Sequence, residues 1–208
     1  MEKNSFEDNF EACKIASPVS GRVILASNSP RRRELLAMII PHFDVELLSG
    51  VDESYPDSLE AYKVPEYLSR LKSDAYTGLL SAGDVLITAD TVVIVDGDIL
   101  GKPQGRDEAI AMLKRLSGRK HCVVTGVTLR DDIHSLSFSA KTEVEFATLT
   151  DDEIADYVDA YRPFDKAGAY GIQEWIGAIA IKGIDGSFYN VMGLPVHALY
   201  RHMKEFKM

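Results

Sequence analysis

Cysteine is scarce in this chain of 208 residues, and its two cysteines, Cys13 and Cys122, lie far apart. Neither belongs to a CxxC pair or to a cluster with histidine, so the sequence predicts neither a disulfide framework nor a zinc site. The five histidines show no HxH or HExxH spacing. This cysteine usage is typical of a protein in a reducing cytoplasm, where we expect this chain to be located.

Long apolar runs are also missing, as is an excess of positive charge. No apolar run approaches the roughly 20 residues of a membrane-spanning helix, and the first residues, MEKNSFEDNFEACKIASP, lack the apolar region of a signal peptide. We interpret residues 1–20 as an extension before a single domain of residues 21–208. Because the net charge is −9, whereas proteins that bind nucleic-acid backbones are more often basic, we expect no nucleic-acid or membrane partner.

What the sequence does contain is enough apolar material for one sizeable core, since 46% of its residues are hydrophobic. Apolar periodicity and turn signals predict strands alternating with helices. A hairpin turn is predicted at Asp96-Gly97 and a second hairpin from 178–181 and 186–191. Together these elements predict an α/β fold with a mixed central sheet and flanking helices. The predicted strands are 23–26, 43–48, 85–89, 92–95, 123–129 and 141–146, and the predicted helices are 31–40, 65–80, 106–116, 150–159 and 196–206.

The stretch ILASNSPRRRELL places three arginines where a helix begins. That end of a helix already carries partial positive charge, so arginine is disfavoured there unless an anion lies nearby. Ser27 and Ser29 add hydroxyl donors, and Arg31 and Arg32 add forked donors suited to phosphate oxygens. The alternative is a solvated first turn in which Ser29 is only an N-cap. A Walker A loop is absent.

Asp90 follows an apolar strand, where a buried and unpaired carboxylate would be costly. Carboxyl ends of strands are common ligand positions in α/β folds, so Asp90 is a candidate Mg²⁺ ligand or general base. The alternative is a structural carboxylate bonded to local backbone. Lys102, in LGKP, follows the hairpin that Asp90 leads into, and it is a candidate for neutralising a phosphate; the alternative is an ordinary exposed lysine.

Two later stretches combine small residues with polar groups. In PFDKAGAYGIQ, Gly168 and Gly171 permit close approach of the backbone to a ligand, and Gln173 offers a donor and an acceptor to a base edge. The alternative is a tightly packed structural loop. In GSFYNVMGLP, Asn190 stands among apolar residues and needs hydrogen-bond partners, which favours a structural role.

Taken together and in this order, these stretches resemble the Maf family of nucleoside triphosphate pyrophosphatases. The resemblance covers nearly everything from about residue 22 to the C-terminus. It implies an elongated, two-lobed α/β fold like that of inosine triphosphatase (Maf/Ham1), with a cleft, and removal of pyrophosphate from a nucleoside triphosphate with a divalent metal, Mg²⁺ or Mn²⁺. It also suggests a homodimer. The matching pieces are ASNSPRR, Glu53 in GVDE, Lys72 after RL, ADTVV, GKP, DKAGAYGIQ and YNVMGLP.

The resemblance also implies a substrate and a role for each matching residue. ADTVV and DKAGAY followed by Gln resemble the dTTP/UTP branch, whereas the 7-methyl-GTP branch usually carries SDQV and a DCAG-like segment. Asp90 matches the proposed catalytic base of the family, although the residues leave open whether it is a base or mainly a metal ligand. The other implied roles are substrate specificity for Arg31, Thr91 and Gln173, phosphate binding for Ser27, Arg32, Lys72 and Lys102, and metal binding for Glu53 with Asp90.

The sequence departs from the family pattern at three places. Asn28 replaces the frequent Gly between two serines, Ser73 replaces the usual Ala after Lys72, and QEWI at 173–176 is expanded relative to QGWG. The last departure touches the expected base pocket and so bears on the substrate more than on the reaction. The expected substrates are therefore dTTP and UTP, with modified pyrimidine nucleotides as further candidates. The alternatives are the same reaction on 7-methyl-GTP and a non-catalytic nucleotide-binding regulator linked to cell division. A kinase or transferase is disfavoured, because this sequence lacks the glycine-rich loop expected of one.

Overall fold

The computed structural model describes residues 17–206, so most of the predicted extension, residues 1–16, lies outside the described residues. A seven-stranded sheet runs through the molecule in the order β2-β1-β3-β5-β6-β7, with β4 beside β3. β1 is parallel to β2 and β3, and the other pairs are antiparallel, which confirms the mixed sheet. The strands are β1 (Val23–Leu25), β2 (Asp44–Val45), β3 (Val85–Val95), β4 (Asp98–Leu100), β5 (Lys120–Arg130), β6 (Ser135–Phe146) and β7 (Ile181–Asp185).

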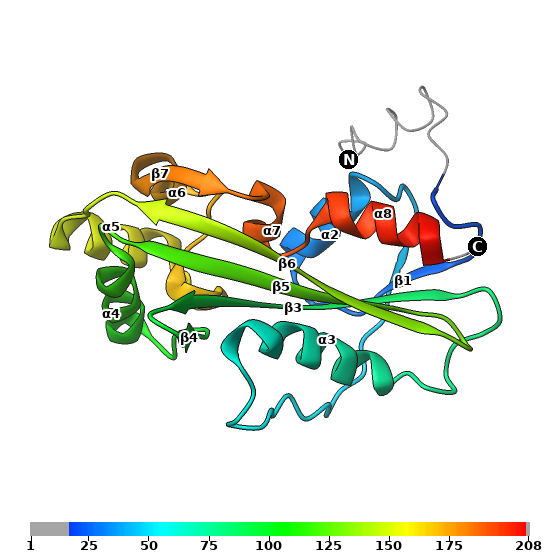
Figure 1. Cartoon of the computed structure of the whole chain (residues 1–208). Coiled ribbons are helices and arrows are strands. Elements are labelled where there is room, and N and C mark those ends of the chain that lie inside the picture. Colours follow the sequence, from blue (N-terminus) through cyan, green and yellow to red (C-terminus); the bar gives the residue numbers. More distant parts are fainter. Residues whose placement is uncertain (1–16, 207–208) are drawn as a thin grey trace.

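Helices cover both faces of the long strands (Figure 1). α3 lies against one face, while α2, α7 and α8 lie against the other, and α4, α5 and α6 gather at the far end of the sheet. None of the helices in residues 17–206 is long and apolar enough to cross a membrane. The helices are α2 (Pro30–Ala37), α3 (Val64–Asp74), α4 (Arg106–Leu116), α5 (Asp151–Tyr161), α6 (Trp175–Ala180), α7 (Phe188–Met192) and α8 (Val196–Phe206), with short 3₁₀ turns η1 (Ala61–Lys63) and η2 (Ala167–Ala169).

The elements with strong local signals were predicted well. α4 and α8 have the predicted bounds, and Thr150 and Glu153 form the predicted reciprocal capping box at the start of α5. The hairpin turn at Asp96-Gly97 is also confirmed, since β3 and β4 pair across it. The other bounds shifted: strand 43–48 shortens to Asp44–Val45, and helix 65–80 ends at Asp74.

Two predictions of secondary structure are wrong. The separate strands 85–89 and 92–95 are one strand, β3, because its ladder with β5 continues unbroken from Leu86 to Ile94. The second hairpin is absent: 178–181 belongs mostly to α6, and 186–191 mostly to α7. A cap explains the helix, because the side chain of Ser187 accepts from the Asn190 N–H and Gly193 ends it with a φ of 116°.

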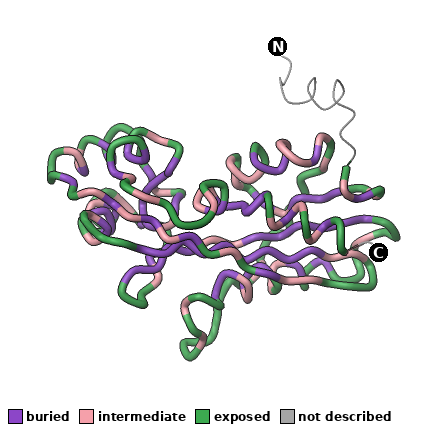
Figure 2. Tube along the Cα trace, turned by 45° about the horizontal axis from the view of Figure 1, so that its top comes forward, coloured by how far each residue is buried: buried purple, intermediate pink, exposed green. Residues whose placement is uncertain are grey.

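Two large core clusters lie at opposite ends of the sheet. One packs α4, α5 and α6 against the sheet through residues such as Leu113, Phe146 and Tyr157. The other packs α2 and α8 against β1 and β3 through residues such as Leu36 and Leu199. Buried residues run along the long strands between the two ends (Figure 2). The molecule therefore has two lobes that share one continuous sheet.

A gap in one edge of β3 separates the lobes. One side of β3 pairs with β5 throughout. On its other side β3 pairs with β1 only over Val85–Ile87 and with β4 only over Val93–Val95. Within the described chain, no strand pairs with residues 88–92 on that side, and these residues include Asp90 and Thr91. The edge of the sheet is therefore open where the sequence places its candidate chemistry.

A buried histidine in the lobe of α4, α5 and α6 makes the stability of the protein depend on pH. His121 is 3% exposed, its Nε2 lies 2.8 Å from Tyr170 Oη, and its ring packs edge-on against Phe146. Burial lowers its pKa from 6.5 to about 4. Because the unfolded chain binds this proton at a higher pH than the folded chain, the contribution is complete above pH 6.5 and is lost as the pH falls towards 4.

We expect this group to reduce the free energy of unfolding by up to about 3 kcal/mol between pH 7 and pH 4. Urea denaturation of the wild type and of His121→Leu at several pH values in this range would measure it. The variant should lose less stability on acidification than the wild type, because both share the contribution of the carboxylates. Parallel pH profiles for the two proteins would contradict the assignment.

Candidate active site

The open edge of β3 lies in a cleft made of two adjoining hollows. The larger, of about 400 Å³, is lined by Ser27, Glu53, Lys72 and Asp90 among others, and the smaller, of about 100 Å³, is lined by Gln173 and apolar side chains. Residues that line both hollows connect them. These shared residues are Ser29, Arg31, Arg32, Thr91, Lys102 and Asp165. The structure thus brings all nine residues predicted from the sequence into one cleft.

The first turn of α2 forms one wall of the larger hollow. Ser29 caps the helix by accepting from the Arg32 N–H at 3.4 Å, and Pro30 opens it. The Ser29 N–H donates to Ser27 Oγ at 3.2 Å, which fixes the turn between β1 and the helix. Because this first turn carries arginines and no acidic residue, the helix N-terminus offers concentrated positive charge to the cleft.

Arg32 fills the gap beside β3. Its Nε donates to Gly193 O at 2.8 Å, one terminal nitrogen donates to Ala89 O at 2.9 Å, and the other donates to Thr91 Oγ1 at 3.0 Å. Loss of solvent around the guanidinium lowers the pKa of Arg32, while the charge of Asp90 raises it. The predicted phosphate ligand is therefore also the group that satisfies the unpaired edge of β3 and ties it to the segment after α7.

Lys72, from the last turn of α3, lies between two carboxylates. Its Nζ is 2.7 Å from Asp90 Oδ1 and 2.8 Å from Glu53 Oε2. The side chains of Lys72 and Asp90 are only 18% and 15% exposed, whereas that of Glu53 is 55% exposed. The predicted metal ligands are thus close to one another, and both are near a cation that had been predicted to bind phosphate.

Asp90 and Glu53 offer two hard oxygen donors to a divalent cation such as Mg²⁺, which favours carboxylate ligands. Within residues 17–206 there is no group of three or more His, Cys, Asp or Glu side chains that could hold a metal ion by themselves.

Asp90 and Thr91 are neighbours on β3 and face opposite sides of the sheet, as successive residues of a strand do. Asp90 meets Lys72 of α3, which covers one face. Thr91 Oγ1 lies 3.0 Å from Thr125 Oγ1 and accepts from Arg32 of α2, on the other face. Because the sheet edge is open here, both side chains line the same hollow.

The smaller hollow has an apolar side and a polar side. Its apolar side consists of Val93, Val123, Val191 and Met192, together with the ring of Tyr170. Its polar side holds the residues shared with the larger hollow, together with Lys166 and the exposed Gln173. An apolar surface beside a few placed polar groups is typical of sites that hold a flat organic group and select it by hydrogen bonds. Lys102 is exposed after β4 and lines both hollows.

Asp165 joins the two lobes across the cleft. Its carboxylate accepts from Arg31 at 2.7 Å and from Lys166 at 2.7 Å. Burial raises the pKa of Asp165, but the hydrogen bonds and charges of Lys166 and Arg31 outweigh burial and lower it to about 2. The sequence gives no sign of this pairing, because Arg31 and Asp165 are separated by 134 positions.

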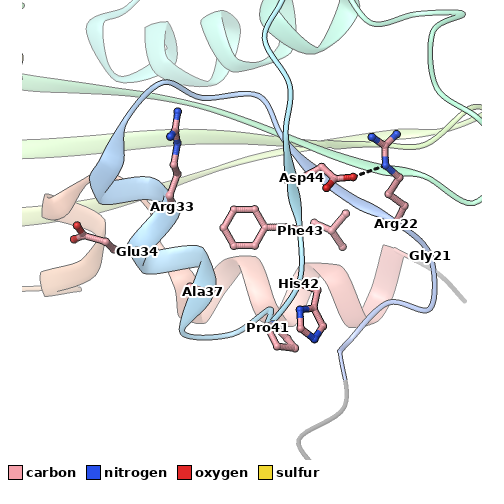
Figure 3. A pocket seen from close by; sticks show the side chains of 10 residues that line it. Gly21, Arg22, Arg33, Glu34, Ala37, Pro41, His42, Phe43 and Asp44 are labelled. Atoms are coloured by element: carbon pink, nitrogen blue, oxygen red, sulfur yellow. Dashed lines mark hydrogen bonds and ion pairs between the residues drawn. The ribbon is translucent and has the colours of Figure 1, made fainter. Parts of the chain in front are cut away.

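A second cavity, of about 700 Å³, lies beside α2 away from this cleft (Figure 3). Phe43 points into it and Arg33 and Glu34 line it from α2, while Arg22 is paired with Asp44 at 2.6 Å. It contains none of the residues that the sequence predicted for the site. Volume alone therefore does not identify the functional site of this molecule.

Comparison with known proteins supports the ordered motifs. The model of the Maf-like protein family matches residues 22–206. The chain belongs to the Maf-like family. This Maf-like protein is 53% identical over 184 residues to the "dTTP/UTP pyrophosphatase" of Bacteroides thetaiotaomicron, covering 88% of this chain and 95% of the relative. It is 54% identical over 187 residues to the protein of the same name from Porphyromonas gingivalis, covering 89% and 94%.

Among solved structures, this Maf-like protein is similar to a HAM1 protein from Coxiella burnetii. The TM-score is 0.46 with 15% sequence identity, and the match covers 89% of this chain and 100% of the other.

Proposed function

We propose that this Maf-like protein hydrolyses dTTP and UTP to the nucleoside monophosphate and pyrophosphate. The observation that carries the proposal is the cleft itself. Asp90, paired with Lys72, lies in a hollow that adjoins a second one, where apolar side chains face the amide of Gln173 and several charged residues. The names of the relatives with half or more of their residues identical point to the same substrates.

The two hollows suggest how the substrate lies. The triphosphate fits the larger hollow, where the α2 N-terminus and Lys72 supply positive charge. The base fits the smaller hollow against Val93 and Tyr170, with its polar edge at Gln173. Arg31 and Lys102 line both hollows and therefore lie where the sugar and the first phosphates would cross from one to the other.

The reaction needs a water molecule made nucleophilic near the α-phosphorus. In our proposal the Asp90 carboxylate accepts a proton from this water, whose oxygen forms a bond to the α-phosphorus. The bond from the α-phosphorus to the bridging oxygen breaks, and its electron pair leaves with pyrophosphate. Lys102 and Arg32 stabilise the charge on that leaving group. Lys72 holds Asp90 in place through their 2.7 Å contact.

We propose Mg²⁺ or Mn²⁺ as the cofactor, held by Asp90 and Glu53. A bound cation would offset the negative charge of the phosphate groups. Because Lys72 contacts both carboxylates, its ammonium must share them with the cation or move towards the phosphates. The predicted role of Lys72 as a phosphate ligand is consistent with the second arrangement.

Location and assembly belong to the same proposal. We propose that the protein acts in the cytoplasm, where its nucleotide substrates occur, and that it forms the homodimer that the family resemblance suggests. Light scattering coupled to size-exclusion chromatography would measure the assembly. We propose no nucleic-acid partner, because the cleft is a local basic cluster in a protein of net charge −9.

Selection among nucleotide bases is the sharpest test of the proposed function. A site that hydrogen-bonds a thymine or uracil edge rejects a base with reversed donors and acceptors, because buried polar groups are then left unpaired. We expect fast pyrophosphate release from dTTP and UTP in a panel that includes CTP, GTP, ATP and 7-methyl-GTP. Gln173→Ala should lower the ratio of kcat/KM for UTP over CTP by about tenfold.

The results of this nucleotide panel distinguish the proposed function from its two alternatives. Preference for 7-methyl-GTP would keep the reaction and overturn the roles of Thr91 and Gln173. Thermal stabilisation by nucleotides without any product would favour the non-catalytic regulator. Equal loss on all nucleotides in Gln173→Ala would argue that Gln173 supports the fold of the site and not its selectivity.

A further inference from the structure

Glu174 is held by two donors behind the predicted base-reading residue. Its carboxylate accepts a hydrogen bond from the phenol of Tyr157 and lies 3.1 Å from Lys166 Nζ. The Glu174 side chain is 18% exposed, Lys166 is 9% exposed and Tyr157 is fully buried. A carboxylate in such surroundings needs partners of this kind, because burial without them is costly. None of these three residues has a role in the reaction described above.

The same phenol also holds the other end of the turn that carries Gln173. The Gly171 N–H donates to Tyr157 Oη at 3.1 Å, and the Glu174 N–H donates to Gly171 O at 3.0 Å. Gly171 leaves room for this arrangement, since a Cβ there would lie 2.7 Å from the carboxyl carbon of Glu174. One buried hydroxyl therefore fastens both Gly171 and Glu174.

Helix α6 restrains the middle of the turn. A Cβ on Gly177 would lie 1.8 Å from the Ile172 carbonyl oxygen, so the helix backbone lies directly against this peptide. Ile172 itself is 5% exposed and packs in the core. Gln173 is then the one residue of the Gly171–Glu174 turn with an exposed side chain. Three residues that restrain this turn, Tyr157, Glu174 and Gly177, line neither hollow.

Charge connects this turn to the other end of the cleft. Lys166 contacts Glu174 at 3.1 Å and Asp165 at 2.7 Å, and Asp165 in turn accepts from Arg31 at 2.7 Å. Two cations and two anions alternate along this chain. Movement of Glu174 would therefore displace Gln173 and, through Lys166 and Asp165, also Arg31.

We propose that Tyr157, Lys166 and Glu174 are positioning residues for base selection, because they hold Gln173 in register with the base and anchor Asp165 against Arg31. This inference rests on the proposed function and extends it to Tyr157 and Glu174, which line neither hollow, and to Lys166, which lines the smaller one. A positioning role predicts that substitutions change base selectivity, measured as the UTP-over-CTP ratio of kcat/KM. A purely structural cluster would alter stability, or all substrates equally.

The first variant is Tyr157→Phe, which keeps the ring stacked on Tyr161 at 5.0 Å and removes only the hydroxyl. We expect KM for UTP to rise about tenfold with kcat changed less than about threefold, and the UTP-over-CTP ratio of kcat/KM to fall about tenfold. Tyr161→Phe is the matched control, because Tyr161 is exposed. This control should leave KM, kcat and the UTP-over-CTP ratio of kcat/KM unchanged.

The second variant, Glu174→Gln, keeps the size of the side chain and an acceptor for Tyr157, but removes the charge opposite Lys166. We expect a smaller fall in selectivity, of about threefold. It also keeps the inference testable if Tyr157→Phe does not fold. Equal losses on UTP and CTP, or a lower melting temperature with the UTP-over-CTP ratio unchanged, would overturn the inference.

Binding measurements separate failure of this inference from failure of the proposed function. Calorimetric titration with the non-hydrolysable α,β-imido analogues of UTP and CTP gives the selectivity without turnover. If the wild type releases no pyrophosphate but binds the uridine analogue more tightly, the variants should still reduce that preference. A wild type that binds both analogues equally would overturn the positioning role.

Discussion

Replacing Asp90 by Asn is expected to lower kcat for UTP and dTTP by about 1000-fold or more, because an amide cannot accept the proton of the attacking water. The fold should survive, since Lys72 keeps its contact with Glu53 at 2.8 Å. Pyrophosphate release measures the first effect, and urea denaturation should place the free energy of unfolding within about 1 kcal/mol of the wild type. Substantial residual turnover would contradict the assignment of Asp90 as a catalytic residue.

The same variant decides between the two roles left open for Asp90. If Asp90 acts mainly as the base, Asp90→Asn should leave the Mg²⁺ concentration for half-maximal activity unchanged while kcat collapses. If it is mainly a ligand, that concentration should rise. Glu53→Gln is the matched control, because Glu53 meets the same ammonium but is 55% exposed. We expect it to shift the Mg²⁺ dependence and to lower kcat less.

Arg32→Lys is expected to damage stability and activity together. Three nitrogens of the guanidinium donate to oxygens of Gly193, Ala89 and Thr91, and a lysine ammonium cannot match this planar fork. We expect the free energy of unfolding to fall by about 2 to 3 kcal/mol, because the carbonyl of Ala89 at the open edge of β3 and that of Gly193 lose their donors. We expect kcat/KM for UTP to fall about 100-fold.

Arg33→Lys is the control for this substitution, because Arg33 is exposed on the same helix and lines the other cavity. It should change neither quantity. Thermal unfolding and steady-state kinetics on both variants provide the comparison. If Arg32→Lys lowers activity with stability unchanged, the guanidinium serves the nucleotide and not the edge of the sheet.

Local signals explain what the sequence predicted well. The bounds of α4 and α8 follow from helical periodicity, and the start of α5 follows from the reciprocal cap of Thr150 and Glu153. The prediction failed where a distant partner decides the structure. β7 forms because its residues reach the edge of β6, a contact that no nearby residue signals. β3 is continuous because β5 pairs across Asp90 and Thr91.

The candidate site divides in the same way. The nine predicted residues could be named because they stand in motifs, and the structure brings them into one cleft. The contacts among them could not be named. Nothing near Lys72 in the sequence indicates that its ammonium lies between Glu53 and Asp90. Likewise, Tyr157 and Glu174 carry no motif of their own, and only the packing of α5 against the turn before α6 reveals their contact.

The placement of Asp90 and Thr91 on opposite faces of one strand has a consequence for how such enzymes diverge. Substitutions around Thr91 act through α2 and the segment at Gly193, whereas those around Asp90 act through α3. With the proposed roles of the two residues, base preference can change by substitutions in one layer while the layer around Asp90 stays the same. The architecture would then allow substrate range and chemistry to evolve separately.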